Sequence, residues 1–208
     1  MTKAPWLTRP RMAAAALVLL GLLGLPPLRH ALEAGMTTHM LVQFPLLALC
    51  GAALANALPA RWRARCNRWN AYGVSGLLAA ALVLAVLMIP RVLDLALVDA
   101  RVEAAKWLAL LVCGAALRIS WRAAGLLVQG FFLGNVLPMT VVAGHLFQDT
   151  PVRLCNAYLL DDQVRLGQWL VGLAACVATA WFAQVLRAMT RQGGAAAIVT
   201  APASPGSR

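Results

Sequence analysis

The chain has 208 residues, of which 62% are hydrophobic and only 12% charged, and its formal net charge is +11. Soluble globular chains carry about a quarter charged residues, so this composition excludes that class. A strongly basic soluble protein would suggest nucleic acid as a partner. The way in which the basic residues are distributed along this chain excludes that partner as well.

Long apolar runs predict an all-α, polytopic integral membrane helical bundle with six transmembrane helices. A helix of about 20 apolar residues spans the hydrocarbon core, and these runs are too long for the strands of a barrel. The predicted spans are Met12–Leu28, Met36–Leu58, Ala71–Pro90, Ala104–Ser120, Ala123–Phe147 and Leu166–Met189. Lys106 and Arg118 lie near the ends of the fourth span, from which long cationic side chains can reach the membrane surface.

Three parts are expected along the chain. Residues 1–11 form a cytoplasmic N-terminal segment, residues 12–191 the six-helix membrane domain, and residues 192–208 a disordered cytoplasmic tail rich in Gly, Ser and Pro. A cleaved signal peptide is the alternative for the first span. The residues Pro26, Pro27, Leu28 and Arg29 make a poor cleavage site, so a retained helix is favoured.

The positions of Lys and Arg predict the orientation, because cytoplasmic segments carry an excess of both. One side of the predicted membrane domain holds Lys3, Arg9, Arg11, Arg61, Arg63, Arg65, Arg68, Arg118, Arg122, Arg187, Arg191 and Arg208. The other side holds Arg29, Arg91, Arg101, Lys106, Arg153 and Arg165, together with all seven acids, Glu33, Asp94, Asp99, Glu103, Asp149, Asp161 and Asp162. Both termini are therefore expected in the cytoplasm, and the protein in a bacterial cell inner membrane. The basic segment from Arg61 to Trp69 is interpreted as an anchor on anionic membrane lipids.

Soft metal ligands gather on the predicted outer side, where all three histidines lie. Met36, His39 and Met40 follow an i, i+3, i+4 spacing on the second helix, so their side chains are neighbours. Thioether and imidazole together suit reduced copper. The alternative is that the methionines only fill apolar packing.

The fifth predicted helix adds Met139 and His145 to this candidate copper pocket. Six residues separate them, about 240° around a helix, so without a kink only one side chain can point inward. His145 is then the expected one, because an imidazole facing lipid costs more than a thioether. Pro45 and Pro138 interrupt the second and fifth helices at similar depth, which predicts that these two helices face one another.

Two stretches of the sequence resemble a known family. They are the run from Thr38 to Leu47, which contains His39 and Met40, and the run from Gly134 through Gly144 to Gly167, which contains Leu159-Leu160-Asp161-Asp162-Gln163. Both are similar to the CtaG-like family of membrane proteins, which is associated with assembly of caa-type cytochrome c oxidases. The matching residues are His39, Met40, Pro138, Met139, Asp162 and Gln163. The family motif has a second histidine where this chain has Gln43, and histidines in the segment that corresponds to residues 99–106.

The resemblance implies a polytopic helical protein that serves copper delivery to the oxidase, with oxidase subunits as partners. No hydrolase or nucleotide-binding motif occurs, and no C-x-x-C pair, so a non-enzymatic role is expected. A structural or accessory subunit of a respiratory membrane complex, with no metal of its own, is the alternative. A small-molecule transporter is favoured less, because it would call for internal repeats or charged residues near the midplane.

Overall fold

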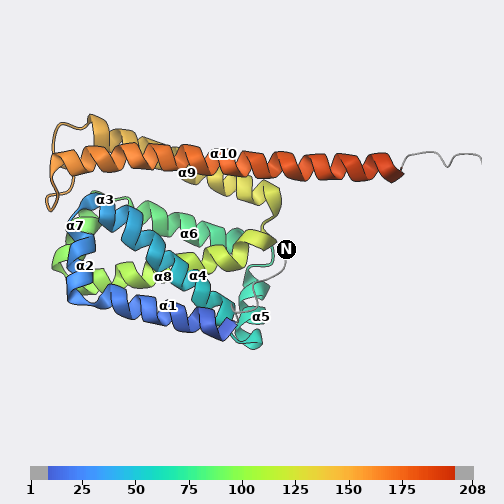
Figure 1. The fold of residues 1–208 in the computed structure, drawn as a ribbon, viewed down its shortest axis with the longest axis horizontal. Coiled ribbons are helices and arrows are strands. Elements are labelled where there is room, and N and C mark those ends of the chain that lie inside the picture. The colour runs from blue at the N-terminus through green and yellow to red at the C-terminus, as the bar shows by residue number, and fades with distance from the viewer. Residues whose placement is uncertain (1–8, 200–208) are drawn as a thin grey trace, which may run out of the picture.

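A computed structural model describes residues 9–199, and over these residues the chain is all-helical. The elements in chain order are α1 (Arg9–Gly24), α2 (Pro26–Glu33), α3 (Met36–Thr38), the π-helical turn η1 (His39–Gln43), α4 (Phe44–Ala57), α5 (Ala60–Trp69), α6 (Val74–Leu87), α7 (Pro90–Val98), α8 (Ala100–Ala123), α9 (Gly125–Asp149) and α10 (Leu160–Val199). The longer helices run back and forth, with α2, α3 and α7 gathered at one end of the bundle and α5 at the other (Figure 1). We call these the α7 end and the α5 end.

The bundle is centred on the packing of α4 against α8. α1 packs on α4, and α6 on α8, while α9 and α10 form a hairpin beside them. Small residues allow the central contact: a Cβ placed at Gly51 or Gly114 would overlap backbone atoms of the facing helix. Helix pairs in membranes use such small residues to bring their backbones close.

The helix that begins at Met36 is interrupted by η1, directly before Pro45. Pro45 has no N–H, so it cannot donate to a carbonyl in the preceding turn. The chain widens there to a π turn, in which the Phe44 N–H donates to the His39 carbonyl. The predicted interruption before Pro45 thus takes the form of a π turn, a feature that occurs often at functional sites.

Within the described residues, three helical stretches are long and apolar enough to cross a membrane: Met36–Ala57, Gly125–Asp149 and Leu160–Arg191. The number rises to five if each of two bent pairs, α1 with α2 and α5 with α6, forms one span; the bends are 75° and 85°. Large apolar side chains such as Leu127 and Phe131 are exposed on the outside of the bundle, as in a protein with lipid for a solvent. The chain is therefore a helical protein with three to five candidate membrane spans.

The predicted spans differ from the structure at three places. The first expected span, Met12–Leu28, is broken, because α1 ends at Gly24 and α2 turns away from it. The third expected span, Ala71–Pro90, corresponds to α6, which has 14 residues and is a candidate only together with α5 across the 85° bend. The fourth expected span falls within α8, which is long enough to cross but is not among the candidate spans. α8 carries Arg101, Glu103, Lys106, Arg118 and Arg122, and a helix with so many ionisable groups is costly in lipid.

The prediction that the two proline-bearing helices face one another is wrong. α9, which contains Pro138, packs mainly against α10 and to a smaller extent against α6 and α8. The neighbour of α4 is α8, because their small residues let these two backbones meet. α10 continues through residues 192–199, the first part of the expected tail. Residues 1–8 and 200–208 of the expected terminal segments lie outside the described part.

Candidate functional site

Seven polar side chains meet at the α7 end of the bundle, and we call them the polar cluster. Its members come from α2, η1, α8 and the loop before α10: Arg29, Glu33, His39, Gln43, Glu103, Lys106 and Tyr158. His39 and Gln43 are fully buried, and 2% of Lys106 is exposed. Buried ionisable groups in membrane helices are candidates for function by default.

The Lys106 ammonium lies at the centre of the cluster. Its Nζ is 2.7 Å from Glu103 Oε2, 2.8 Å from His39 Nε2, 3.2 Å from Gln43 Oε1 and 3.5 Å from Glu33 Oε1. An ammonium has three protons to donate, and two of its four neighbours are carboxylates. Lys106 is thus a buried cation held by groups from three helical elements.

This arrangement fixes the tautomer of His39. A charged Lys106 can only donate, so His39 Nε2 accepts and the ring proton lies on Nδ1. The Nδ1–H then donates to the Tyr158 hydroxyl oxygen, 2.7 Å away. Burial raises the pKa of Tyr158, so its phenol stays neutral. Both ring nitrogens of His39 are therefore used inside the protein.

The charges of the cluster balance. Arg29 Nε lies 3.4 Å from Glu33 Oε2, which gives two cations and two carboxylates around a neutral histidine. Gln43 joins the halves, because its amide nitrogen donates to Glu33 at 3.2 Å and its oxygen accepts from Lys106. A buried group of ions is tolerated when it is paired in this way and its remaining atoms are hydrogen-bonded.

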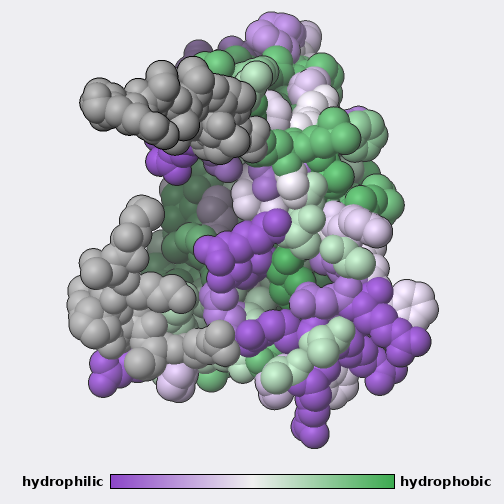
Figure 2. All heavy atoms as spheres, turned by 90° about the vertical axis from the view of Figure 1, so that its right-hand side faces the viewer, coloured by the Kyte–Doolittle hydropathy of each residue, from purple (hydrophilic) through white to green (hydrophobic). Residues whose placement is uncertain are grey.

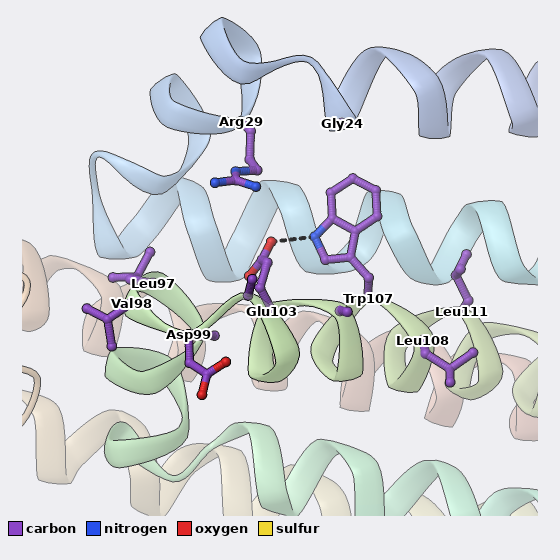
Figure 3. A pocket seen from close by; sticks show the side chains of 12 residues that line it. Gly24, Arg29, Leu97, Val98, Asp99, Glu103, Trp107, Leu108 and Leu111 are labelled. Carbon is purple, nitrogen blue, oxygen red and sulfur yellow. Dashed lines mark hydrogen bonds between the residues drawn. The ribbon is translucent and has the colours of Figure 1, made fainter.

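A cavity of about 650 Å³ reaches the cluster from the side of α1, α7 and α8. Figure 3 shows Glu103 and Trp107 beside this cavity, with Arg29 approaching from α2. Trp107 Nε1 donates to Glu103 Oε1 at 2.6 Å, and the other oxygen of the same carboxylate pairs with Lys106. Glu103 thus separates the cavity from the buried centre of the cluster.

The loop of residues 150–159 closes the cluster from the hairpin side. The backbone N–H groups of Asn156 and Ala157 donate to Asp94 at 2.9 and 3.4 Å. Gln163 holds the other end, since its oxygen accepts from the Leu154 N–H at 2.8 Å and its nitrogen donates to the Phe147 carbonyl at 3.1 Å. These bonds place Tyr158 against His39.

Asp162 makes a second bridge between the hairpin and the start of the η1 helix. Its carboxylate accepts from the Met36 N–H and, at 2.9 Å, from the Thr37 hydroxyl. The first N–H groups of a helix lack partners within the helix, and a carboxylate there satisfies one of them. Cys155, in the same loop, is a buried thiol whose Sγ lies 3.7 Å from the Pro90 carbonyl oxygen.

The structure brings together three of the five predicted copper ligands and separates the other two. Met36, His39 and Met40 are all buried at the α7 end. Met139 is half-buried on α9, and His145 is exposed. The expectation that His145 points inward is wrong, because α9 turns its buried face, with Gly144 and Phe147, toward α10.

The residues present do not fit a copper ion in this arrangement. The His39 nitrogens are taken by Tyr158 and Lys106, and the ammonium stands where a cation bound to Nε2 would have to lie. Within residues 10–191, no group of three or more His, Cys, Asp or Glu side chains could hold a metal ion. Copper binding at Met36, His39 and Met40 stays a prediction, and it requires His39 to release Tyr158 or Lys106.

The sequence interpretation missed the ionic half of this site. It placed Lys106 at the membrane edge and Glu33 in an outer loop, whereas both lie in the polar cluster. One signal was present, because Glu103 and Lys106 are three residues apart on α8, a spacing that pairs opposite charges on a helix. Tyr158 had no such signal, because only the folded loop brings it to His39.

The two stretches that carry the family resemblance meet at this site through the bond between His39 and Tyr158, and Asp162 bonds Met36, two residues before the first stretch. Gln43, which stands where the family motif has a second histidine, lies in the same cluster, as do Glu103 and Lys106 from the segment of residues 99–106. Comparisons of the chain with models of protein families, with curated proteins and with solved structures found no match.

Proposed function

We propose that this chain is a non-enzymatic assembly factor for a respiratory oxidase of the cytochrome c oxidase type in a bacterial inner membrane. The observation that carries the proposal is the meeting of the two stretches that resemble the CtaG-like family. Residues that are more than 100 positions apart in the sequence are bonded here: His39 of the first stretch bonds Tyr158 of the second, and Asp162 of the second bonds Met36 and Thr37, directly before the first. A nascent oxidase subunit is the partner that the resemblance implies.

The proposed topology has six passes, with both termini in the cytoplasm. In support, α1, α4, α6, α8, α9 and α10 alternate in direction along the bundle (Figure 1). The acids Glu33, Asp94, Glu103 and Asp162 lie at the α7 end, while the arginines of α5 lie at the other. Because basic segments stay in the cytoplasm, the α5 end faces inward and the polar cluster faces the periplasm.

Reporter fusions test this topology. Fusions after Trp69 and after Gly194 are expected to report a cytoplasmic position, and a fusion after Val152 a periplasmic one. A periplasmic signal after Trp69 would reverse the assignment.

Deletion of the gene in its own bacterium tests the function. We expect the mature oxidase to lose activity in the membranes while other respiratory enzymes keep theirs. Wild-type protein restores the oxidase activity, whereas Tyr158→Phe, which removes the bond to His39, and Asp162→Ala, which removes the bonds to Met36 and Thr37, restore less. Arg187→Gln, on the exposed part of α10, is the matched control, and immunoblots establish equal amounts of each variant. Full oxidase activity in the deletion strain would refute the proposal.

The closed polar cluster favours one second candidate, a structural or accessory subunit of a respiratory complex. Such a subunit needs no side-chain nitrogen free to bind a metal, and His39 has none, since both its ring nitrogens are engaged. Affinity purification of the tagged chain separates the two candidates. A subunit is recovered in equal amounts with the mature, haem-containing complex, whereas an assembly factor is recovered with incomplete oxidase subunits.

Copper handling is tested by titrating Cu(I) against a competing chelator in detergent. A site at the second helix predicts weaker binding in both Met36→Leu and His39→Ala. It also predicts tighter binding in Tyr158→Phe, because removing the phenol frees Nδ1. Equal copper affinity in the wild type and the three variants would exclude the copper site and leave the role of a structural or accessory subunit.

A further inference from the structure

A groove of about 770 Å³ lies between α4, α8 and α9, and it extends toward the α5 end. Its walls are mostly apolar: Pro45, Ala48 and Ala52 from α4, Gly114 from α8 and Phe132 from α9. The small side chains leave room along the two parallel helices α4 and α8, and an acyl chain has the shape and polarity to fill such a space.

The end of the groove nearest α5 is strongly basic. Arg118 and Arg122 line it, together with Trp121. The two arginines are four residues apart, so they are neighbours on the surface of α8. Both are exposed, and neither forms an ion pair with any residue of the described part.

The chain cannot neutralise these arginines itself. All seven acids lie in or next to the elements of the α7 end and the outer loop. The α5 end adds further cations on α5 and α10: Arg61, Arg63, Arg65, Arg68, Arg187 and Arg191. Figure 2 looks onto this end and shows hydrophilic side chains gathered on its lower part. An anionic molecule of the membrane surface would therefore be complementary to this end of the bundle.

We propose that this groove binds one anionic phospholipid of the membrane leaflet at the α5 end. An acyl chain lies along Ala48 and Ala52, and the phosphate accepts hydrogen bonds from Arg118 and Arg122, which suit a phosphodiester because guanidinium groups pair with phosphate oxygens. Free phosphate would leave the apolar groove unfilled, and a neutral lipid would leave the charge uncompensated. This inference does not depend on the proposed role in oxidase assembly.

Trp121 provides a local reporter, because bromine on an acyl chain quenches tryptophan fluorescence at contact. The full-length protein is placed in nanodiscs of phosphatidylcholine that contain brominated phosphatidylglycerol or, in parallel, the same fraction of brominated phosphatidylcholine. The Trp121 signal is the difference between wild type and Trp121→Phe. We expect phosphatidylglycerol to quench this signal at a lower mole fraction than phosphatidylcholine. Equal quenching by the two lipids would overturn the proposal.

Charge variants locate the headgroup. A basic side chain at a membrane surface strengthens binding of anionic lipid by about fivefold, so Arg118→Gln with Arg122→Gln is expected to lower the preference by about 25-fold. Arg187→Gln with Arg191→Gln removes the same amount of charge from α10, away from the groove, and is expected to leave the preference for anionic lipid unchanged. A loss of preference in both double variants would show general surface attraction and refute a site.

A third variant tests the groove separately from the charge. Ala52→Phe places a ring in the groove and leaves both arginines unchanged, so it is expected to abolish contact between the brominated chain and Trp121. Circular dichroism checks that its helix content matches wild type. Undiminished quenching in a folded Ala52→Phe protein would show that the acyl chain lies elsewhere, against the proposal.

Discussion

Removing the cation at the centre of the polar cluster should destabilise the protein strongly. In Lys106→Met the carboxylates of Glu33 and Glu103 lose their closest buried cation, at 3.5 and 2.7 Å. The side chains are buried, with 1% of Lys106, 9% of Glu33 and 11% of Glu103 exposed, so solvent screens them little. Breaking one partner of a buried pair costs about 3–5 kcal/mol, and we expect a loss of that size in the free energy of unfolding.

The loss is measured by unfolding the protein in mixed micelles with increasing SDS and following helix content by circular dichroism. Arg101→Met removes one positive charge from an exposed position of the same helix and is expected to change the free energy by less than about 0.5 kcal/mol. Adding Glu103→Gln to Lys106→Met should recover part of the loss, because no unpaired charge then remains at that carboxyl. A Lys106→Met effect no larger than that of Arg101→Met would refute a charged, desolvated cluster.

Two further predictions concern packing and thiol reactivity. Gly114→Ala places a methyl group against the backbone of α4 and should destabilise the protein by about 1–3 kcal/mol in the same SDS assay. Gly21→Ala meets no neighbour within 4 Å and should stabilise the protein slightly. Equal effects of the two substitutions would contradict the close contact between α4 and α8. Burial, and then the nearby Asp94, raise the pKa of the Cys155 thiol to about 12 from its usual 9.0. Below pH 9 the reactive thiolate of Cys155 is about a thousandfold scarcer than that of an ordinary cysteine. Maleimide should therefore label the half-buried Cys66 well before Cys155. Rapid labelling of Cys155 would show that the loop is open.

Composition and long apolar runs predicted the helical membrane class, because both reflect the solvent that each stretch of chain can tolerate. They could not predict that α1 ends at Gly24 or that α5 turns away from α6. A bend changes the direction of an apolar run without changing its hydropathy. The arrangement of the helices was equally hidden, since it depends on where Gly51 and Gly114 let two backbones meet.

Only the part of the candidate site that depends on local helical spacing could be predicted from the sequence. Met36, His39 and Met40 follow a helical spacing, and this local pattern was enough to place them together. Lys106 was assigned to the membrane surface because a lone lysine near the end of an apolar helix can extend to water. The structure buries it, since Glu33 and Glu103 supply the counter-charges, and Glu33 comes from a segment more than 70 residues away in the sequence.

The contacts that define the site also hold the α9–α10 hairpin to the rest of the bundle. His39 bonds Tyr158 from the loop, and Asp162 bonds the N-terminus of the helix that carries His39. A change at His39 therefore alters the polar cluster and the hairpin together. Loss of function in His39→Ala alone cannot distinguish a role of His39 as a metal ligand from a role in positioning the hairpin. Tyr158→Phe separates them, because it removes the bond to the hairpin and leaves the 2.8 Å contact between His39 and Lys106 in place. If Tyr158→Phe fails in oxidase assembly as fully as His39→Ala, then the position of the hairpin is what assembly requires.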